Sequence, residues 1–578
     1  MRNHSIAVFV AMVALASVAR ADEQSPPPTR FNEATVADLQ AQMAAGRLTS
    51  VDLTTFYLKR IKQLDENGPG LNSIIELNPD ALAIAASADA ERQQGMVRGP
   101  LHGIPVLLKD NIDTGDQMQT TAGSLALAGA PAVRDSTVAA NLRAGGAVIL
   151  GKTNLSEWAN FRSFFSTSGW SGRGGLARNP YSLDRNACGS SSGSGAAASA
   201  NLTAVSLGSE TDGSIVCPAN VNGVVGLKPT VGLTSRAGVV PISHVQDTVG
   251  PHTRTVADAA AVLGVIQSRG GDGRDPATAG VPLGWRGRSR PTNIPTDYTQ
   301  FLDTNGLRGA KIGVTRQGVD NAPPQVGAAF DAAIAAIEGA GAMVVDLDAE
   351  GFTFPSADGE FLVLLFDFKV DVQTYFASRA GVPMAGKTLA DAIAFNTANA
   401  AAEMPFFGQE IFELAQQIDT SSPDAPQPAF GGMTYNQALD IDQNAGVNGI
   451  DLALSRFHLD AIVAPTDGPA WTTDLINSDH FIFASSGLAA APGYPIVQVP
   501  AGVVLGVPVG ISFFGTAFSE PTLIRLASGF ESATHARVVP TFAPTLPASH
   551  LDGVPLSPPP RGEHRDEHRD NGKRPHRM

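Results

Sequence analysis

Three side chains that could together activate a serine lie in three short stretches of this chain. Lys109 ends the run IPVLLK, Ser190 lies in GSSSGSG, and Ser214 lies in the loop GSETDGS. A serine hydroxyl is a weak nucleophile until a partner takes its proton, and a serine–lysine arrangement is one way to achieve this. The three residues therefore supply a nucleophile, a hydroxyl relay and a base without a histidine.

The proposed base requires a lysine that is neutral. Lys109 follows the apolar run Ile104–Leu108, which has the length and composition of a buried strand. Burial disfavours the ammonium form and lowers the pKa of a lysine. We therefore expect Lys109 to titrate well below its ordinary range.

The loop that carries Ser214 has the pattern of a strand, a tight turn and a helix. The apolar stretch 202–207 precedes the polar turn 208–214, and the apolar segment Ile215–Val221 follows it. Backbone N–H groups at the start of a helix point toward one spot and stabilise negative charge there. The pattern predicts Ser214 at a helix N-terminus, beside an oxyanion site.

These motifs resemble those of the amidase signature family, and within it most closely those of bacterial peptide amidases. The resemblance extends over roughly residues 32–545 and is densest from Gly103 to Thr255. It is carried by GIPVLLKDN, GKTNLSEWANFRS, CGSSSGSGAA, GSETDGSIVCPANVNGVVGLKPTVG and DTVGPHTRTVADAA. It implies an α/β fold with a mixed central β-sheet of about eleven strands between α-helical layers, and one amidase domain over residues 22–545.

The resemblance also implies a role for each matching residue. Lys109 would be the general base, Ser190 a bridging serine on a cis peptide bond, and Ser214 the nucleophile that forms the acyl-enzyme. Ser190 and Ser214 are 24 positions apart, as in the family pattern. The oxyanion hole would be formed by the backbone N–H groups of Thr211, Asp212, Gly213 and Ser214.

The substrate pocket is less clearly marked. Asp212 stands where the commonest family form has glycine, and a side chain there would narrow the approach to the oxyanion hole or contact the substrate. Ser168, Gly169 and Trp170 are pocket candidates because they precede the serine-rich loop. By its place in the family, the apolar, helical segment Phe361–Gln416 would also line the pocket.

The residues leave two alternatives to this triad open. Ser191 or Ser192 could take the relay role, although the family spacing favours the first serine of the run. A Ser-His-Asp triad could combine the nucleophile with His244 and Asp247, which are three residues apart. Nothing in the sequence brings their side chains to the nucleophile, so hydrogen bonding within their loop is the favoured interpretation.

The composition is that of a large enzyme with a well-buried core. The 578 residues are 43% hydrophobic and include 60 glycines, and no linker divides the middle of the chain. Lysine and arginine number 40 against 55 aspartates and glutamates, a net charge of −15. This charge argues against nucleic acid and anionic membrane surfaces as partners; a small-molecule or peptide amide is the expected partner.

The N-terminus has the pattern of a secretory signal peptide. Arg2 and His4 precede the apolar run Ile6–Val18, and the small-x-small sequence Ala19-Arg20-Ala21 follows. The run is too short for a stable membrane anchor. The pattern predicts a signal peptide over residues 1–21 and export to the periplasm or the medium.

Export raises the question of the two cysteines. Cys188 lies two residues before Ser190, and Cys217 lies three residues after Ser214. Buried free thiols are the favoured expectation, and a disulfide that braces the two loops is the alternative in an oxidising compartment. Two cysteines without matching histidines predict no structural metal site, and the chemistry needs no cofactor.

The periodicity of the chain indicates an α/β architecture. Apolar patterns alternate between helical and extended segments, which by itself predicts a largely parallel sheet covered on both faces. The clearest units are helix 137–144 with strand 147–150, and strand 311–314 with helix 325–339 and strand 343–347. The tail 546–578 is proline-rich, then charged, and is expected to be disordered.

The sequence therefore predicts an exported serine hydrolase of carboxamides that works through an acyl-enzyme, with C-terminal peptide amides as the expected substrates. An aryl acylamidase or esterase on the same fold is an alternative. A glutaminase subunit of a transfer-RNA amidotransferase is a second, and the predicted signal peptide argues against it. A non-catalytic binding protein is a third, and the complete set of Lys109, Ser190 and Ser214 argues against that.

Overall fold

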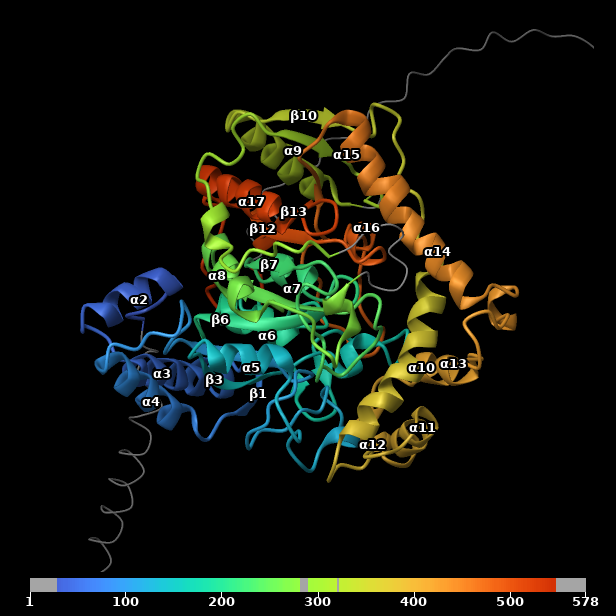
Figure 1. The fold of residues 1–578 in the computed structure, drawn as a ribbon, viewed down its shortest axis with the longest axis horizontal. Coiled ribbons are helices and arrows are strands. Elements are labelled where there is room, and N and C mark those ends of the chain that lie inside the picture. The colour runs from blue at the N-terminus through green and yellow to red at the C-terminus, as the bar shows by residue number, and fades with distance from the viewer. Residues whose placement is uncertain (1–28, 281–289, 320–321, 547–578) are drawn as a thin grey trace, which may run out of the picture.

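An eleven-stranded mixed β-sheet runs through the protein, with helices packed around it (Figure 1). The computed structural model describes residues 29–280, 290–319 and 322–546. The predicted signal peptide lies outside these ranges, as does the predicted tail beyond Leu546. In spatial order the strands are β1 (Ile74–Leu77), β3 (Val148–Thr153), β2 (Pro105–Lys109), β6 (Val205–Glu210), β8 (Thr248–Thr253), β7 (Val225–Lys228), β12 (Ile496–Val504), β13 (Val507–Phe514), β11 (Ala461–Pro465), β9 (Lys311–Val314) and β10 (Met343–Asp346).

The sheet is mixed, so the expectation of a largely parallel sheet was wrong and the mixed sheet implied by the family resemblance is confirmed. Strand β2 is parallel to β3 and β6, and β9 is parallel to β10 and β11. The remaining neighbours in the sheet are antiparallel. One reason is a hairpin that the helix–strand alternation does not reveal. Strands β12 and β13 are joined by Leu505 and Gly506, both at positive φ, as a two-residue hairpin turn requires.

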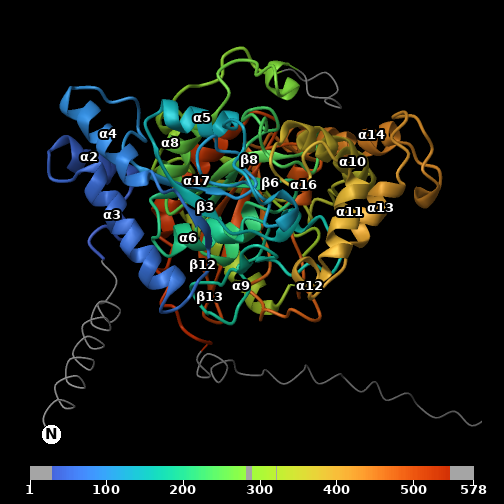
Figure 2. The ribbon, with the colours of Figure 1, turned by 90° about the horizontal axis from the view of Figure 1, so that it is seen from below.

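Helices cover the sheet and extend beyond it. They are α2 (Val36–Ala44), α3 (Ser50–Arg60), α4 (Ala81–Gln93), α5 (Thr137–Ala144), α6 (Ser192–Ser199), α7 (Val216–Val221), α8 (Val256–Ile266), α9 (Pro324–Gly339), α10 (Glu360–Ser378), α11 (Leu389–Ala398), α12 (Ala400–Glu403), α13 (Glu410–Gln417), α14 (Tyr435–Ala445), α15 (Leu452–Phe457), α16 (Gly487–Ala490) and α17 (Glu520–Thr534). Figure 2 shows α2–α4, in blue, and α10–α14, in yellow to orange, at opposite sides of the molecule. None of the helices in the described ranges is both long and apolar enough to cross a membrane.

Local sequence signals set several of these boundaries. The Thr49 hydroxyl accepts from the Asp52 N–H at 3.0 Å, and the Asp52 carboxylate accepts from the Thr49 N–H at 3.3 Å. This capping box begins α3. The Ser136 hydroxyl caps α5 by accepting from the Ala139 N–H at 3.2 Å. Helix α5 and strand β9 have the predicted bounds, whereas β3 continues beyond the predicted strand to Thr153.

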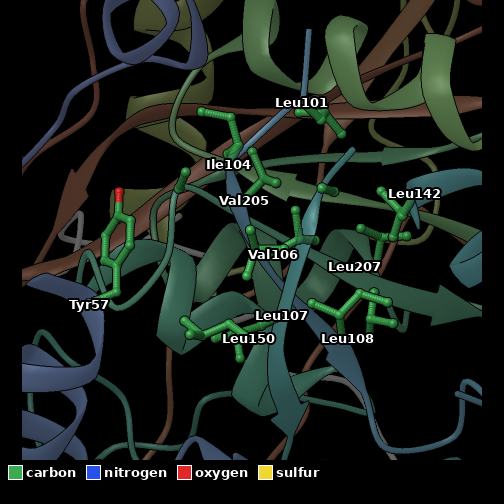
Figure 3. Packing of buried hydrophobic residues seen from close by; sticks show 14 of the residues in the cluster. Tyr57, Leu101, Ile104, Val106, Leu107, Leu108, Leu142, Leu150, Val205 and Leu207 are labelled. Carbon is green, nitrogen blue, oxygen red and sulfur yellow. The ribbon is translucent and has the colours of Figure 1, made fainter. Parts of the chain in front are cut away.

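The strand that carries Lys109 lies in the densest part of the core. Figure 3 shows Val106, Leu107 and Leu108 of β2 packed among Leu150 of β3 and Val205 of β6, and all are fully buried. Burying one such side chain contributes about 1.5–3 kcal/mol to folding. The backbone that presents Lys109 is therefore held rigidly from both neighbouring strands.

Candidate active site

Lys109 is the last residue of β2, and its side chain is fully buried. Its Nζ lies 2.7 Å from Ser190 Oγ, and it is also within hydrogen-bond distance of the Ser209 Oγ and carbonyl oxygen, at 3.0 and 3.2 Å. Burial lowers the pKa of Lys109 to about 7, against the opposing effect of the carboxylates of Asp247 and Glu210. A substantial fraction of this lysine is therefore neutral at physiological pH and can accept a proton.

Ser190 follows Gly189 through a cis peptide bond. A side chain at Gly189 would collide with the hydroxyls of Ser156 and Ser168, so only glycine allows this close approach. The Ser190 carbonyl oxygen also accepts from the Ser156 N–H at 3.0 Å. These contacts fix the Ser190 hydroxyl against Lys109.

The two other candidate relay serines point elsewhere. Ser191 Oγ donates to the Ser209 carbonyl oxygen at 3.1 Å, and Ser192 Oγ donates to the Cys188 carbonyl oxygen. Of the three serines, Ser190 is thus the one whose hydroxyl meets Lys109 Nζ.

Ser214 lies in the turn between β6 and α7, and its carbonyl oxygen accepts from the Ser191 N–H at 3.2 Å. Ser214 lies at the N-terminal end of α7, as predicted: α7 starts at Val216, and the N–H groups of Ile215 and Val216 donate to the Glu210 carboxylate. The turn itself also contains backbone N–H groups that can act as donors. Its Gly213 has a φ of +74°, a left-handed conformation that glycine adopts without strain.

The turn is also held from outside. The Thr211 hydroxyl donates to Asp247 Oδ1 at 2.6 Å, and the Gln246 amide donates to the Thr211 carbonyl oxygen at 3.1 Å. Among the described residues, none accepts a hydrogen bond from the N–H groups of Asp212, Gly213 or Ser214. Three donors in one fixed turn can serve a developing oxyanion.

The two cysteines form a disulfide, so the expectation of free thiols was wrong. The loops of Ser190 and Ser214 converge, and this places the Cα atoms of Cys188 and Cys217 6.0 Å apart, within the range that a disulfide spans. The sequence contained the spacing of each cysteine from its serine but not the distance between the loops. The bond joins the loops that carry Ser190 and Ser214, and both cysteines line the same cavity as these serines.

We expect the disulfide to stabilise the protein measurably. Closing a loop of 29 residues reduces the entropy of the unfolded chain by an amount worth about 3–4 kcal/mol. The double variant Cys188→Ser/Cys217→Ser should therefore unfold at lower urea concentration, with that loss in the free energy of unfolding. Thiol counting on denatured protein, purified without reductant, should find no free thiol before reduction and two afterwards; two thiols before reduction would contradict the bond.

A cavity of about 270 Å³ opens at the two serines. Its lining residues are Ala159, Asn160, Ser168, Cys188, Gly189, Ser190, Asp212, Gly213, Ser214, Cys217, Asp467, Trp471, Asp479, Phe481, Ala484 and Ser486. Of the predicted pocket residues, Ser168 lines it, whereas the Gly169 N–H donates to Ser156 and Trp170 packs edge-on against Phe406 and Phe407.

The far wall of this cavity was missed by the sequence reasoning. It comes from residues 467–486, which follow β11, and not from the predicted segment Phe361–Gln416. No local motif marks residues 467–486, so only the fold could place them. The Asp212 side chain does line the cavity, as its departure from the common glycine suggested.

His244 and Asp247 do not form a triad with Ser214. His244 Nδ1 lies 2.9 Å from Asp371 and 3.5 Å from Asp367, while Asp247 binds Thr211. Although burial opposes it, the two carboxylates raise the pKa of His244 to about 9, so this imidazole is protonated and cannot act as a base at neutral pH. His244, Asp367 and Asp371 are the cluster in the described chain with the spacing of metal ligands. His244 and Asp371 line a separate, larger cavity of about 600 Å³.

Comparison with known proteins agrees with this geometry. The amidase family model matches residues 52–524. A probable amidase of Arabidopsis thaliana is 42% identical over 527 residues, which cover 89% of this chain and 92% of that protein. One component of the glutamyl-tRNA(Gln) amidotransferase of Chloroflexus aurantiacus is 33% identical over 88% of this chain and 98% of its own length.

Comparison with solved structures leads to the same family. The native peptide amidase of Stenotrophomonas maltophilia is 48% identical and superposes with a TM-score of 0.79, over 89% of this chain and all of that one. A peptide amidase in complex with the competitive inhibitor chymostatin is 47% identical with a TM-score of 0.79, over 88% of this chain and 99% of that one. The chain therefore belongs to the amidase signature family and is an amidase.

Proposed function

We propose that this amidase hydrolyses primary carboxamides at the C-terminus of short peptides through an acyl-enzyme on Ser214. The observation that carries the proposal is the buried contact of 2.7 Å between Lys109 Nζ and Ser190 Oγ, beside the turn of Ser214. This contact links a lysine of lowered pKa to a hydroxyl that can pass its proton on.

The reaction follows from these positions. Neutral Lys109 takes the proton of Ser190, Ser190 takes the proton of Ser214, and the Ser214 oxygen attacks the amide carbon. The N–H groups of Thr211, Asp212, Gly213 and Ser214 stabilise the oxyanion of the tetrahedral intermediate.

The intermediate then collapses. Its C–N bond breaks as the relayed proton returns through Ser190 to the leaving nitrogen, and ammonia departs. Water attacks the resulting ester of Ser214 by the same relay, which releases the acid and restores the serine. Each proton taken up by Lys109 is returned, so the cycle balances.

Two features favour a peptide amide among the possible amides. The peptide amidases are 47–48% identical to this chain, compared with 33% for the amidotransferase component. The cavity of about 270 Å³ is slightly smaller than a typical site for a drug-sized ligand and suits the terminal residue of a peptide. We regard the aryl acylamidase, esterase, glutaminase-subunit and binding-protein alternatives as less well supported.

Export completes the proposal. The disulfide between Cys188 and Cys217 supports it, because such bonds form and persist in oxidising compartments. The predicted signal sequence over residues 1–21 has the composition that export requires. We therefore propose a periplasmic or secreted enzyme.

Intact-mass spectrometry with a fluorophosphonate, together with an assay of ammonia release from a peptide amide, tests the function. We expect one covalent adduct that peptide mapping places on Ser214, and ammonia from the C-terminal amide. An adduct without ammonia would redirect the search to anilides and esters. The absence of any adduct would contradict the serine mechanism.

A further inference from the structure

Asp467 is a buried carboxyl group without a protein partner in the wall of the Ser214 cavity. It lies two residues after β11, and neither of its side-chain oxygens accepts a hydrogen bond. The large majority of buried side-chain polar atoms in proteins are hydrogen-bonded. A carboxyl group that lines a cavity and has two free acceptor oxygens is therefore a site for a donor that the substrate brings.

Two more carboxyl groups line the same cavity. Asp212 Oδ1 is buried and accepts no hydrogen bond, and Asp479 accepts from the Ser168 N–H at 3.0 and 3.2 Å. Among the described residues that line this cavity, none is a lysine, an arginine or a histidine. The lining of this cavity therefore contains three carboxyl groups and no basic side chain.

Nearby cations do not neutralise Asp467. Lys228 is buried and donates to the Tyr494 carbonyl oxygen at 2.6 Å. Its electrostatic interactions are with the carboxyl groups of Glu210, Glu520 and Asp212. Burial, together with the carboxylates of Asp212 and Glu210, raises the pKa of Asp467 well above its ordinary value. A cation in the cavity would oppose these effects and favour the ionised carboxylate.

The aromatic part of the wall suits a cation as well. Trp471 and Phe481 both line the cavity, with ring centroids 6.0 Å apart and planes at 86°. The face of an aromatic ring attracts ammonium and guanidinium groups, most strongly for tryptophan. Carboxylates and aromatic faces together are the usual surroundings of a bound organic cation.

We propose that Asp467, with the rings of Trp471 and Phe481, binds a positively charged group in the acyl part of the substrate, an ammonium or a guanidinium. The proposal rests on the proposed function at Ser214 and names its substrate class: amides of basic residues, or short amides with a free α-amino group. Asp212 and Asp479 are the other two carboxyl groups of the same cavity.

Matched substrates test the subsite in the wild-type enzyme. N-acetyl-argininamide and N-acetyl-citrullinamide have nearly the same shape and differ in charge at the side chain, whereas leucinamide and N-acetyl-leucinamide differ in charge at the α-amino group. We expect kcat/KM for the cationic member of at least one pair to exceed that of its neutral partner by about tenfold or more, as for a charge-assisted hydrogen bond. The preferred pair tells whether a side chain or the α-amino group is bound. Equal kcat/KM within both pairs would overturn the proposal without any need for a variant.

Asp467→Asn then tests the residue itself, because it keeps the size of the side chain and removes its charge. We expect the ratio within the preferred pair to fall to about one, because the cationic member loses more kcat/KM than its neutral partner. Asp331→Asn is the matched control: it removes the same charge from an exposed position on α9 that pairs with Arg316, and it should leave the ratio unchanged. An equal loss of kcat/KM on both substrates would show that Asp467 does not distinguish a charged substrate from a neutral one. This result would also overturn the proposal.

A binding measurement separates this proposal from the proposed function. The rate at which the fluorophosphonate labels Ser214 should be slowed more by the cationic member of the preferred pair than by its neutral partner, and Asp467→Asn should abolish this difference. Such selective protection would support the subsite even if no amide were hydrolysed, in which case only the proposed function would fail. Equal protection by both members of each pair would contradict the subsite.

Discussion

The Ser214→Ala variant is expected to hydrolyse amides at least about 10⁴-fold more slowly than the wild-type protein, with its fold intact. Alanine lacks the oxygen that forms the acyl-enzyme, and removal of a serine nucleophile costs about 10⁶-fold in kcat in serine hydrolases that have been dissected in this way. The side chain is small and lies in a turn at the cavity, so its loss leaves the core unchanged. Ammonia release from a peptide amide measures activity, and thermal unfolding measures stability.

Two serine variants control this result. Ser190→Ala should also be strongly impaired, because it removes the hydroxyl that meets Lys109. Ser192→Ala removes a neighbouring hydroxyl that donates to the Cys188 carbonyl oxygen, and it should retain far more activity. A Ser214→Ala protein with near wild-type activity would refute the mechanism.

Replacement of Lys109 should have the next largest effect. Lys109→Met removes the base while it keeps an apolar side chain of similar length, and we expect kcat/KM to fall by about 10³-fold or more. Lys109→Arg should be similarly inactive, because arginine keeps the positive charge but is not deprotonated in proteins. Recovery of activity in Lys109→Arg would indicate a role for the charge and not for proton transfer.

The pH dependence has a definite sign. The pKa of Lys109 is lowered to about 7, and the proposed mechanism uses the neutral lysine. The rate for the wild-type protein should therefore rise as the pH increases through about 7 and level off above it. A rate that falls over this range would contradict a lysine base.

Local signals and long-range packing explain what the sequence could and could not predict. Lys109, Ser190 and Ser214 each lie in a dense motif, so their positions followed from short stretches of sequence. Helix α5 was predicted from the apolar pattern of residues 137–144, and the structure shows that its N-cap, Ser136, and the glycine that follows Ala144 also adjoin it in sequence. Features of this kind depend on neighbours along the chain.

The missed features depend on contacts between distant segments. The disulfide requires the distance between two loops, and the cavity wall at Asp467 and Trp471 requires the path of the chain after β11. The direction of the strands was mispredicted partly because the hairpin of β12 and β13 was not recognised, and partly because antiparallel neighbours such as β7 and β12 come from distant parts of the chain. No window of sequence contains that information.

The order of strands in the sheet also constrains how the enzyme is made. All three residues of the proposed triad lie within the first 214 positions, yet β7 pairs with β12, and the cavity wall is supplied by residues 467–486 (Figure 1). Pairing between segments so far apart in sequence carries a larger loop-closure cost than pairing between neighbouring segments. A chain that is being synthesised therefore contains Ser214 for nearly half of its length before the last residue of the cavity wall, Ser486, has been added.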